Sequence, residues 1–166
     1  MNTPIRFILF CLMSAFISTA HADTATSTFQ VQITITKSCS VTSGTPINFG
    51  NVAASSPSVI RNTSISVNCS RLTPYTVGLS PSNSNKLGSG LMSGAIGGNT
   101  DKVPYQLAKD ADGTVVWGSE TAAGSSNVVS DSGSGGPQPL TVYAKVANAN
   151  FTPDVYTDTV TVTVTY

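Results

Sequence analysis

The sequence predicts an all-β chain that folds as a β-sandwich. Two segments, residues 29–36 and 156–166, alternate apolar and polar side chains, which is the period of a strand with one buried face. Turn residues such as Pro, Gly and Asn separate further short runs that are rich in β-branched and aromatic residues. No segment has the spacing of a long amphipathic helix. Many short strands in two packed sheets are therefore the expected architecture.

The first 22 residues have the pattern of a secretory signal peptide. Arg6 supplies a positive charge, a short apolar stretch follows it, and Ala20-His21-Ala22 fits the small-residue cleavage site. The apolar stretch is too short to span a bilayer comfortably. We therefore expect residues 1–22 to be removed on export, leaving a single domain that starts at Asp23.

Residues 23–36 form an N-terminal segment with one apolar face. Residues 23–28 are small and polar, and the alternating run comes after them. In an extended strand, one side of this run carries Phe29, Val31, Ile33 and Ile35. The periodicity alone favours a first strand within the chain's own sheet. It is also the pattern of a strand that one molecule donates to another.

Two cysteines, Cys39 and Cys69, remain once the signal peptide and Cys11 are removed. An even pair in an exported protein indicates a disulfide. The bond would close a loop of about 30 residues, which stabilises a fold by about 3.6 kcal/mol in the chain-entropy model.

The centre of the chain carries the remaining strand signals. Each is a short run of β-forming residues that ends at a turn, and Asp112-Gly113 between two such runs is typical of a hairpin. The Gly- and Ser-rich residues 130–136 are expected to form a loop. The predicted central strands are residues 39–42, 47–49, 59–69, 75–79, 103–107, 114–117, 126–129 and 140–146.

The last alternating run predicts a strand with threonines on one face and apolar residues on the other. A sandwich would normally place one more strand beside this one, and the sequence has no residues after it. We therefore expect the edge of an unfinished sheet to carry Val160, Val162, Val164 and Tyr166.

The chemistry available argues against catalysis, metal binding and nucleic-acid binding. The one histidine, His21, lies in the signal peptide, so a Ser–His–Asp arrangement is excluded from the mature chain. Asp110-Ala111-Asp112-Gly113 resembles the start of a calcium loop but lacks the closing glutamate. Paired cysteines leave no zinc ligands. Eight basic and eight acidic residues form no basic patch. We expect no enzymatic activity, no cofactor, no metal and no nucleic-acid partner.

Taken together, these features resemble the spore coat protein U domain family, which includes subunits of the archaic chaperone–usher pili of Gram-negative bacteria. The resemblance covers essentially the whole mature chain, and the order of its pieces makes it specific. The pieces are Cys39-Ser40-Val41, Ile47-Asn48-Phe49-Gly50, Ile65-Ser66-Val67-Asn68-Cys69, Val103-Pro104-Tyr105-Gln106-Leu107 with Asp110, Trp117-Gly118, and Tyr156-Thr157-Asp158-Thr159-Val160-Thr161-Val162-Thr163-Val164.

The resemblance implies an incomplete immunoglobulin-like β-sandwich that lacks its last strand and is completed by donor-strand exchange. Residues 37–166 would be the pilin domain, and residues 23–36 would be the donor segment. The donor side chains would be Phe29, Val31, Ile33 and Ile35, and the edge of the acceptor groove would carry Val160, Val162, Val164 and Tyr166.

The family also implies partners and a location. A periplasmic chaperone would first cover the open edge, and at an outer-membrane usher the next subunit's donor segment would replace the chaperone. The expected product is a head-to-tail adhesive pilus on the cell surface that supports attachment and biofilm formation. A single domain with its own donor segment favours a shaft or adaptor subunit over a tip adhesin.

The chain departs from the family pattern at two places. Ala108 stands where the family often has a tyrosine, and the region around Leu91 and Met92 lacks an expected arginine. Both departures bear on which pilus subunit the chain is, more than on the family resemblance.

Two other interpretations remain open. A self-contained secreted coat protein would pair residues 29–36 within its own sheet. A monomeric extracellular binding module would bind a glycan or small ligand on a platform of Tyr75, Tyr105 and Trp117.

Overall fold

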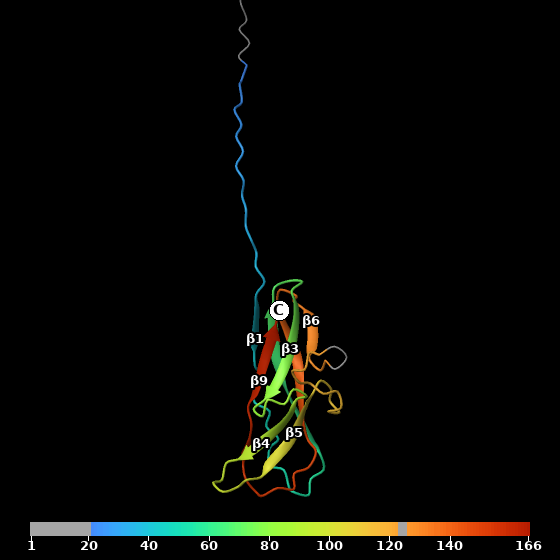
Figure 1. Cartoon of the computed structure of the whole chain (residues 1–166). Coiled ribbons are helices and arrows are strands. Elements are labelled where there is room, and N and C mark those ends of the chain that lie inside the picture. Colours follow the sequence, from blue (N-terminus) through green and yellow to red (C-terminus); the bar gives the residue numbers. More distant parts are fainter. Residues whose placement is uncertain (1–20, 123–125) are drawn as a thin grey trace, which may run out of the picture. The chain divides into compact units, whose positions relative to one another are not determined.

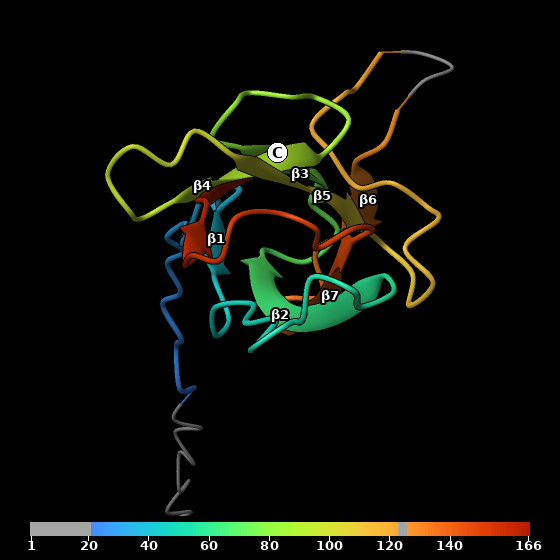
Figure 2. The same cartoon turned by 90° about the horizontal axis from the view of Figure 1, so that it is seen from below.

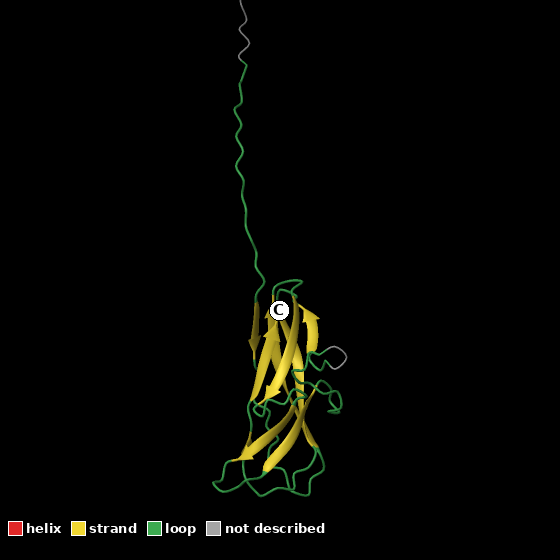
Figure 3. Cartoon of the chain, in the orientation of Figure 1, coloured by secondary structure: helices red, strands yellow, loops and turns green. Residues whose placement is uncertain are grey.

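The computed structural model describes residues 21–122 and 126–166. Residues 1–20 of the expected signal peptide lie outside the described residues. Within the described residues all regular structure is β, in agreement with the predicted fold class (Figure 3). In this part of the chain, no helix has the length and apolar character needed to span a bilayer.

The described strands form two antiparallel sheets (Figure 1). The larger sheet has the order β1 (Cys39–Thr42), β2 (Val59–Cys69), β7 (Pro137–Val146), β5 (Lys102–Ala108), β4 (Ser89–Gly94) and β8 (Tyr156–Thr157). The smaller sheet has the order β6 (Val129–Ser132), β3 (Pro74–Pro81) and β9 (Val160–Thr165). The larger sheet curls, so that β2 and β7 lie on one side of the end-on view and β4 and β5 on the other (Figure 2). The architecture is an incomplete immunoglobulin-like sandwich.

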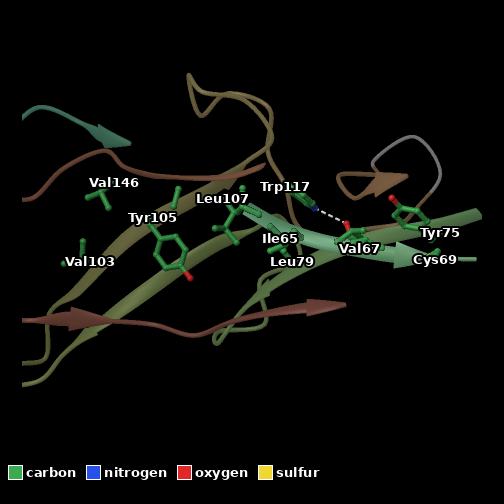
Figure 4. Packing of buried hydrophobic residues seen from close by; sticks show 13 residues of the cluster. Ile65, Val67, Cys69, Tyr75, Leu79, Val103, Tyr105, Leu107, Trp117 and Val146 are labelled. Atoms are coloured by element: carbon green, nitrogen blue, oxygen red, sulfur yellow. Dashed lines mark hydrogen bonds between the residues drawn. The ribbon is translucent and has the colours of Figure 1, made fainter. Parts of the chain in front are cut away.

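The core lies between the two sheets and follows the alternation of the strands. Ile65 and Val67 of β2 point inward, as do Val77 and Leu79 of β3, and all four are buried. Trp117 lies among them with 1% of its surface exposed. Its indole Nε1 donates a hydrogen bond to the main-chain oxygen of Val77 at 2.9 Å (Figure 4). Tryptophan is therefore accommodated here with its one polar group satisfied.

The last alternating run forms two strands, so the prediction of one continuous strand is wrong. β8 pairs with β4 in the larger sheet, and β9 pairs with β3 in the smaller sheet. Asp158 and Thr159 lie between them, where the chain passes from one sheet to the other. The Asp158 carboxylate accepts hydrogen bonds from the Tyr105 hydroxyl at 2.7 Å and from the Thr159 amide at 2.8 Å. Alternation cannot reveal these contacts.

Other strands also differ from the prediction. Residues 29–36 and 47–49 form no strand, and residues 114–117 contribute a single bridge, between Val116 and Ala108. Strand β4 was not predicted because four of its six residues are serine or glycine, which are common in turns, and glycine is also depleted in strands. It forms against β5, where Gly90 faces Tyr105, and a Cβ on Gly90 would overlap the tyrosine ring.

Candidate functional site

A groove of about 940 Å³ opens between the two sheets. Its floor comes from alternate residues of β5 and β7, and one wall comes from β9. Ile47 and Phe49, from the loop that follows β1, also line the groove. Figure 4 shows several floor residues along the inner face of the sheet. The floor is apolar and consists mainly of Val103, Leu107, Val142, Ala144 and Val146, with Tyr105.

Strand β9 borders this groove and has one free edge. It pairs with β3 on one side, and no strand of the described residues pairs with its other side. The N–H and C=O groups of a free edge can accept another strand. The groove and the free edge together are what a sandwich offers when one strand is missing.

The four residues predicted at this edge occupy different surroundings. Val160 and Val162 line the groove. Val164 is half-buried against the core. Tyr166 is 56% exposed and borders a second, shallower hollow together with Tyr75 and Asp131. The structure thus gathers two of the four at the groove and places Val164 farther along β9 and Tyr166 just after the end of that strand.

The predicted donor residues form an exposed apolar stripe. Residues 21–38 contain no strand or helix, and Phe29, Val31, Ile33 and Ile35 are each between 81% and 89% exposed. Isolated apolar residues on a surface are ordinary, but these four would form one continuous apolar face if the segment were a strand.

Cys39 and Cys69 form the predicted disulfide. Cys39 is the first residue of β1 and lies opposite Cys69, the last residue of β2. The bond therefore fixes the start of β1 to the end of β2.

A hydrogen bond between Tyr105 and Asp158 lies in the groove lining. Burial raises the pKa of Tyr105, and the bond to the Asp158 carboxylate raises it further, so the phenol stays protonated. Burial alone would raise the pKa of Asp158, but hydrogen bonds from Ser82, Tyr105 and Thr159 outweigh it and lower that pKa. The pair therefore combines a neutral donor with a charged acceptor, which is the stronger kind of hydrogen bond.

The lowered pKa of Asp158 predicts a loss of stability in acid. A carboxylate with a depressed pKa stabilises the fold above its unfolded pKa, about 3.9, and this contribution disappears as the pH falls through the lower folded value. We expect the wild-type chain to have a higher Tm than Asp158→Asn at pH 6, with the difference shrinking as the pH falls below about 4. Thermal unfolding followed by circular dichroism from pH 6 to 2 measures this.

Tyr105→Phe serves as the control, because it leaves Asp158 in place but removes one of the bonds that lower its pKa. Its Tm should depend on pH less steeply than that of the wild type. Parallel pH profiles for the wild type and Asp158→Asn would contradict the role given to this carboxylate.

A second set of hydrogen bonds connects residues that line the groove to the loop after β4, and the sequence did not predict it. The Asp154 carboxylate accepts bonds from the Asn99 side-chain amide at 2.7 Å and from the Ile96 amide at 3.0 Å. Asn99 also donates to the Tyr156 hydroxyl at 3.0 Å. Asp154 and Tyr156 both line the groove. Because Asn99 and Asp154 are 55 residues apart, no local sequence pattern links them.

The structure rules out the platform proposed for a binding module. Tyr75, Tyr105 and Trp117 are all buried, and Trp117 is held in the core by its bond to Val77. An aromatic platform needs exposed ring faces, so this part of the third interpretation is wrong. Within the described ranges, no group of three or more His, Cys, Asp or Glu residues could hold a metal ion.

Comparison with known proteins gives a family match and a structural match. The model of the Spore Coat Protein U domain matches residues 25–163. The fold is similar to a chain in the crystal structure of the CsuC–CsuE chaperone–tip adhesion subunit pre-assembly complex, from the archaic chaperone–usher Csu pili of Acinetobacter baumannii. The TM-score is 0.55 at 20% identity, and the similarity covers 80% of this chain and 41% of that chain. No curated protein matches the chain by sequence.

Proposed function

Because the chain belongs to the Spore Coat Protein U domain family, we propose that it is a structural, non-catalytic subunit of a secreted pilus assembled by the chaperone–usher route. Residues 23–36 are the donor segment, and residues 37–166 are the domain that receives a neighbour's donor. The fibre serves attachment and biofilm formation.

The observation that carries this proposal is an open groove beside an unpaired strand edge, in a chain that also has an exposed apolar stripe. Burying four large apolar side chains contributes about 1.5–3 kcal/mol each, or roughly 6–12 kcal/mol before the entropy of ordering is subtracted. The free edge of β9 adds backbone hydrogen bonds that do not depend on sequence. A non-covalent joint of this kind can hold a stable fibre together.

The same groove explains the proposed partners. A bare strand edge with an apolar groove beside it promotes aggregation, so a periplasmic chaperone covers it until assembly. At an outer-membrane usher, the donor segment of the next subunit takes the chaperone's place. Donor and acceptor are different surfaces, so the contact is head to tail and produces an open filament. The subunit passes through the periplasm and ends in the pilus at the cell surface.

Changing Ile33 to Asp is expected to abolish polymerisation. Ile33 lies in the middle of the donor stripe, and an unpaired carboxylate in an apolar groove costs several kcal/mol. The protein is exported to the periplasm with its candidate chaperone and usher and run on a gel unheated and boiled. The wild type should give a ladder of multimers that collapses to monomer on boiling, and Ile33→Asp should give monomer in both lanes.

Thr34→Asp is the matched control, because it adds the same charge one residue later on the opposite face of the strand. It should keep the ladder. A wild-type chain that is monomeric in both lanes and stable without a chaperone would refute the pilus proposal and favour a self-contained secreted domain.

A further inference from the structure

The charged residues that the structure places in the groove lining are all acidic. Among the described residues that line it, the only charged ones are Asp154 and Asp158. Asp158 precedes β9 and belongs to the same alternating set as Val160 and Val162, which face the groove. An incoming strand must place some side chain against this carboxylate.

The donor stripe ends in a charge of the opposite sign. In the strand period the next residue on the face of Ile33 and Ile35 is Lys37, which is exposed. Lys37 therefore faces the groove if the donor strand continues for two more residues. Phe29 and Val31 precede it on the same face and carry no charge.

The direction and register of the donor strand determine which of its residues lies opposite Asp158. An antiparallel strand that sets Ile35 and Ile33 opposite Val160 and Val162, the two residues of β9 that line the groove, places Lys37 opposite Asp158. A slip of two residues would put Ile35 over the carboxylate, and a slip of four would put Ile33 there. A parallel strand in the same register would put Ser27, which carries no charge, opposite Asp158. Asp158 already accepts bonds from Tyr105 and Thr159 and is half-buried. An apolar side chain over it would remove its remaining hydration without adding a partner, so the first arrangement is favoured.

Building on the proposed function, we propose that Lys37 of the incoming subunit forms an ion pair with Asp158 of the acceptor, and that this pair fixes the donor strand antiparallel to β9 in that register. The apolar stripe supplies the generic attraction. The charged pair selects one of the registers that would otherwise bury the same face, since slips of two residues do not change which face is buried. The pair also discriminates against donor strands that lack a cation at this position.

A double-mutant cycle on the assembled fibre tests the pair. Lys37→Met, Asp158→Asn and the double variant are assembled as above, and the rate at which the ladder dissociates at a fixed elevated temperature is measured. Lys37→Met should speed dissociation roughly tenfold. Asp158→Asn, which also loses the bond from Tyr105, should speed it at least as much, and the double variant should be no faster than Asp158→Asn alone. Lys37→Arg, which retains the charge, should behave like the wild type.

Asp154→Asn is the matched control, and its effect should add to that of Lys37→Met. Additive effects of Lys37→Met and Asp158→Asn, or coupling of Lys37 to Asp154 instead, would overturn the proposed pair while leaving the pilus function intact. Absence of a wild-type ladder would overturn both proposals.

Discussion

Replacing Trp117 with alanine is expected to lower the free energy of unfolding by about 3–5 kcal/mol. The indole is 1% exposed and packs in the core between the sheets. Its removal leaves a large cavity and also takes away the hydrogen-bond donor of the Val77 main-chain oxygen. Small domains are typically stable by only about 5–15 kcal/mol, so this single change should remove much of the stability. Urea unfolding of the purified subunit, followed by circular dichroism, measures the loss.

Two further variants test which property of Trp117 causes the loss of stability. Trp117→Phe keeps most of the volume but loses the hydrogen bond to Val77, and an unsatisfied buried group costs about 1–3 kcal/mol. Val115→Ala changes a residue two positions away that is about half exposed, and it should cost less than about 0.5 kcal/mol. If Trp117→Ala and Val115→Ala lost equal stability, the core position assigned to the indole would be wrong.

The strands predicted best are those in which side-chain alternation and burial coincide. Strand β2 has the predicted bounds, and the inner faces of β3 and β5 follow the predicted period. In these strands one face packs on the core along most of the length, so the apolar residues recur at every second position. Local sequence then carries enough information to locate the strand.

The features that the sequence could not reveal depend on distant partners. Strand β4 forms because β5 supplies its hydrogen bonds, although four of its six residues are serine or glycine. The break before β9 falls at Asp158, whose carboxylate is bonded to Tyr105, 53 residues away in sequence. The groove was expected from the C-terminal run, but much of its lining comes from β5, β7 and the loop after β1. Alternation shows that a face is buried, and it does not show which other element covers that face.

A peptide of residues 23–38 is expected to raise the Tm of a subunit that lacks residues 23–36. The truncated subunit retains all residues that line the groove and the free edge of β9. A ligand that binds only the folded state adds about 2.7 kcal/mol at one hundred times its dissociation constant. For a domain of this size that corresponds to an increase of roughly 10 °C. Thermal unfolding with increasing peptide measures the shift, which should grow with the logarithm of the peptide concentration.

Matched peptides determine whether the stripe itself is recognised. A peptide with Ile33→Asp should give no shift, whereas one with Thr34→Asp, which has the same charge and length, should act like the native peptide. The two variant peptides differ only in which strand face carries the added charge. They therefore separate recognition of one face from general attraction between an apolar peptide and an apolar surface. Equal shifts from both would mean that the groove does not distinguish the faces, which contradicts strand addition beside β9. A shift from the native and Thr34→Asp peptides alone would link the exposed stripe to the open groove without requiring a chaperone or usher.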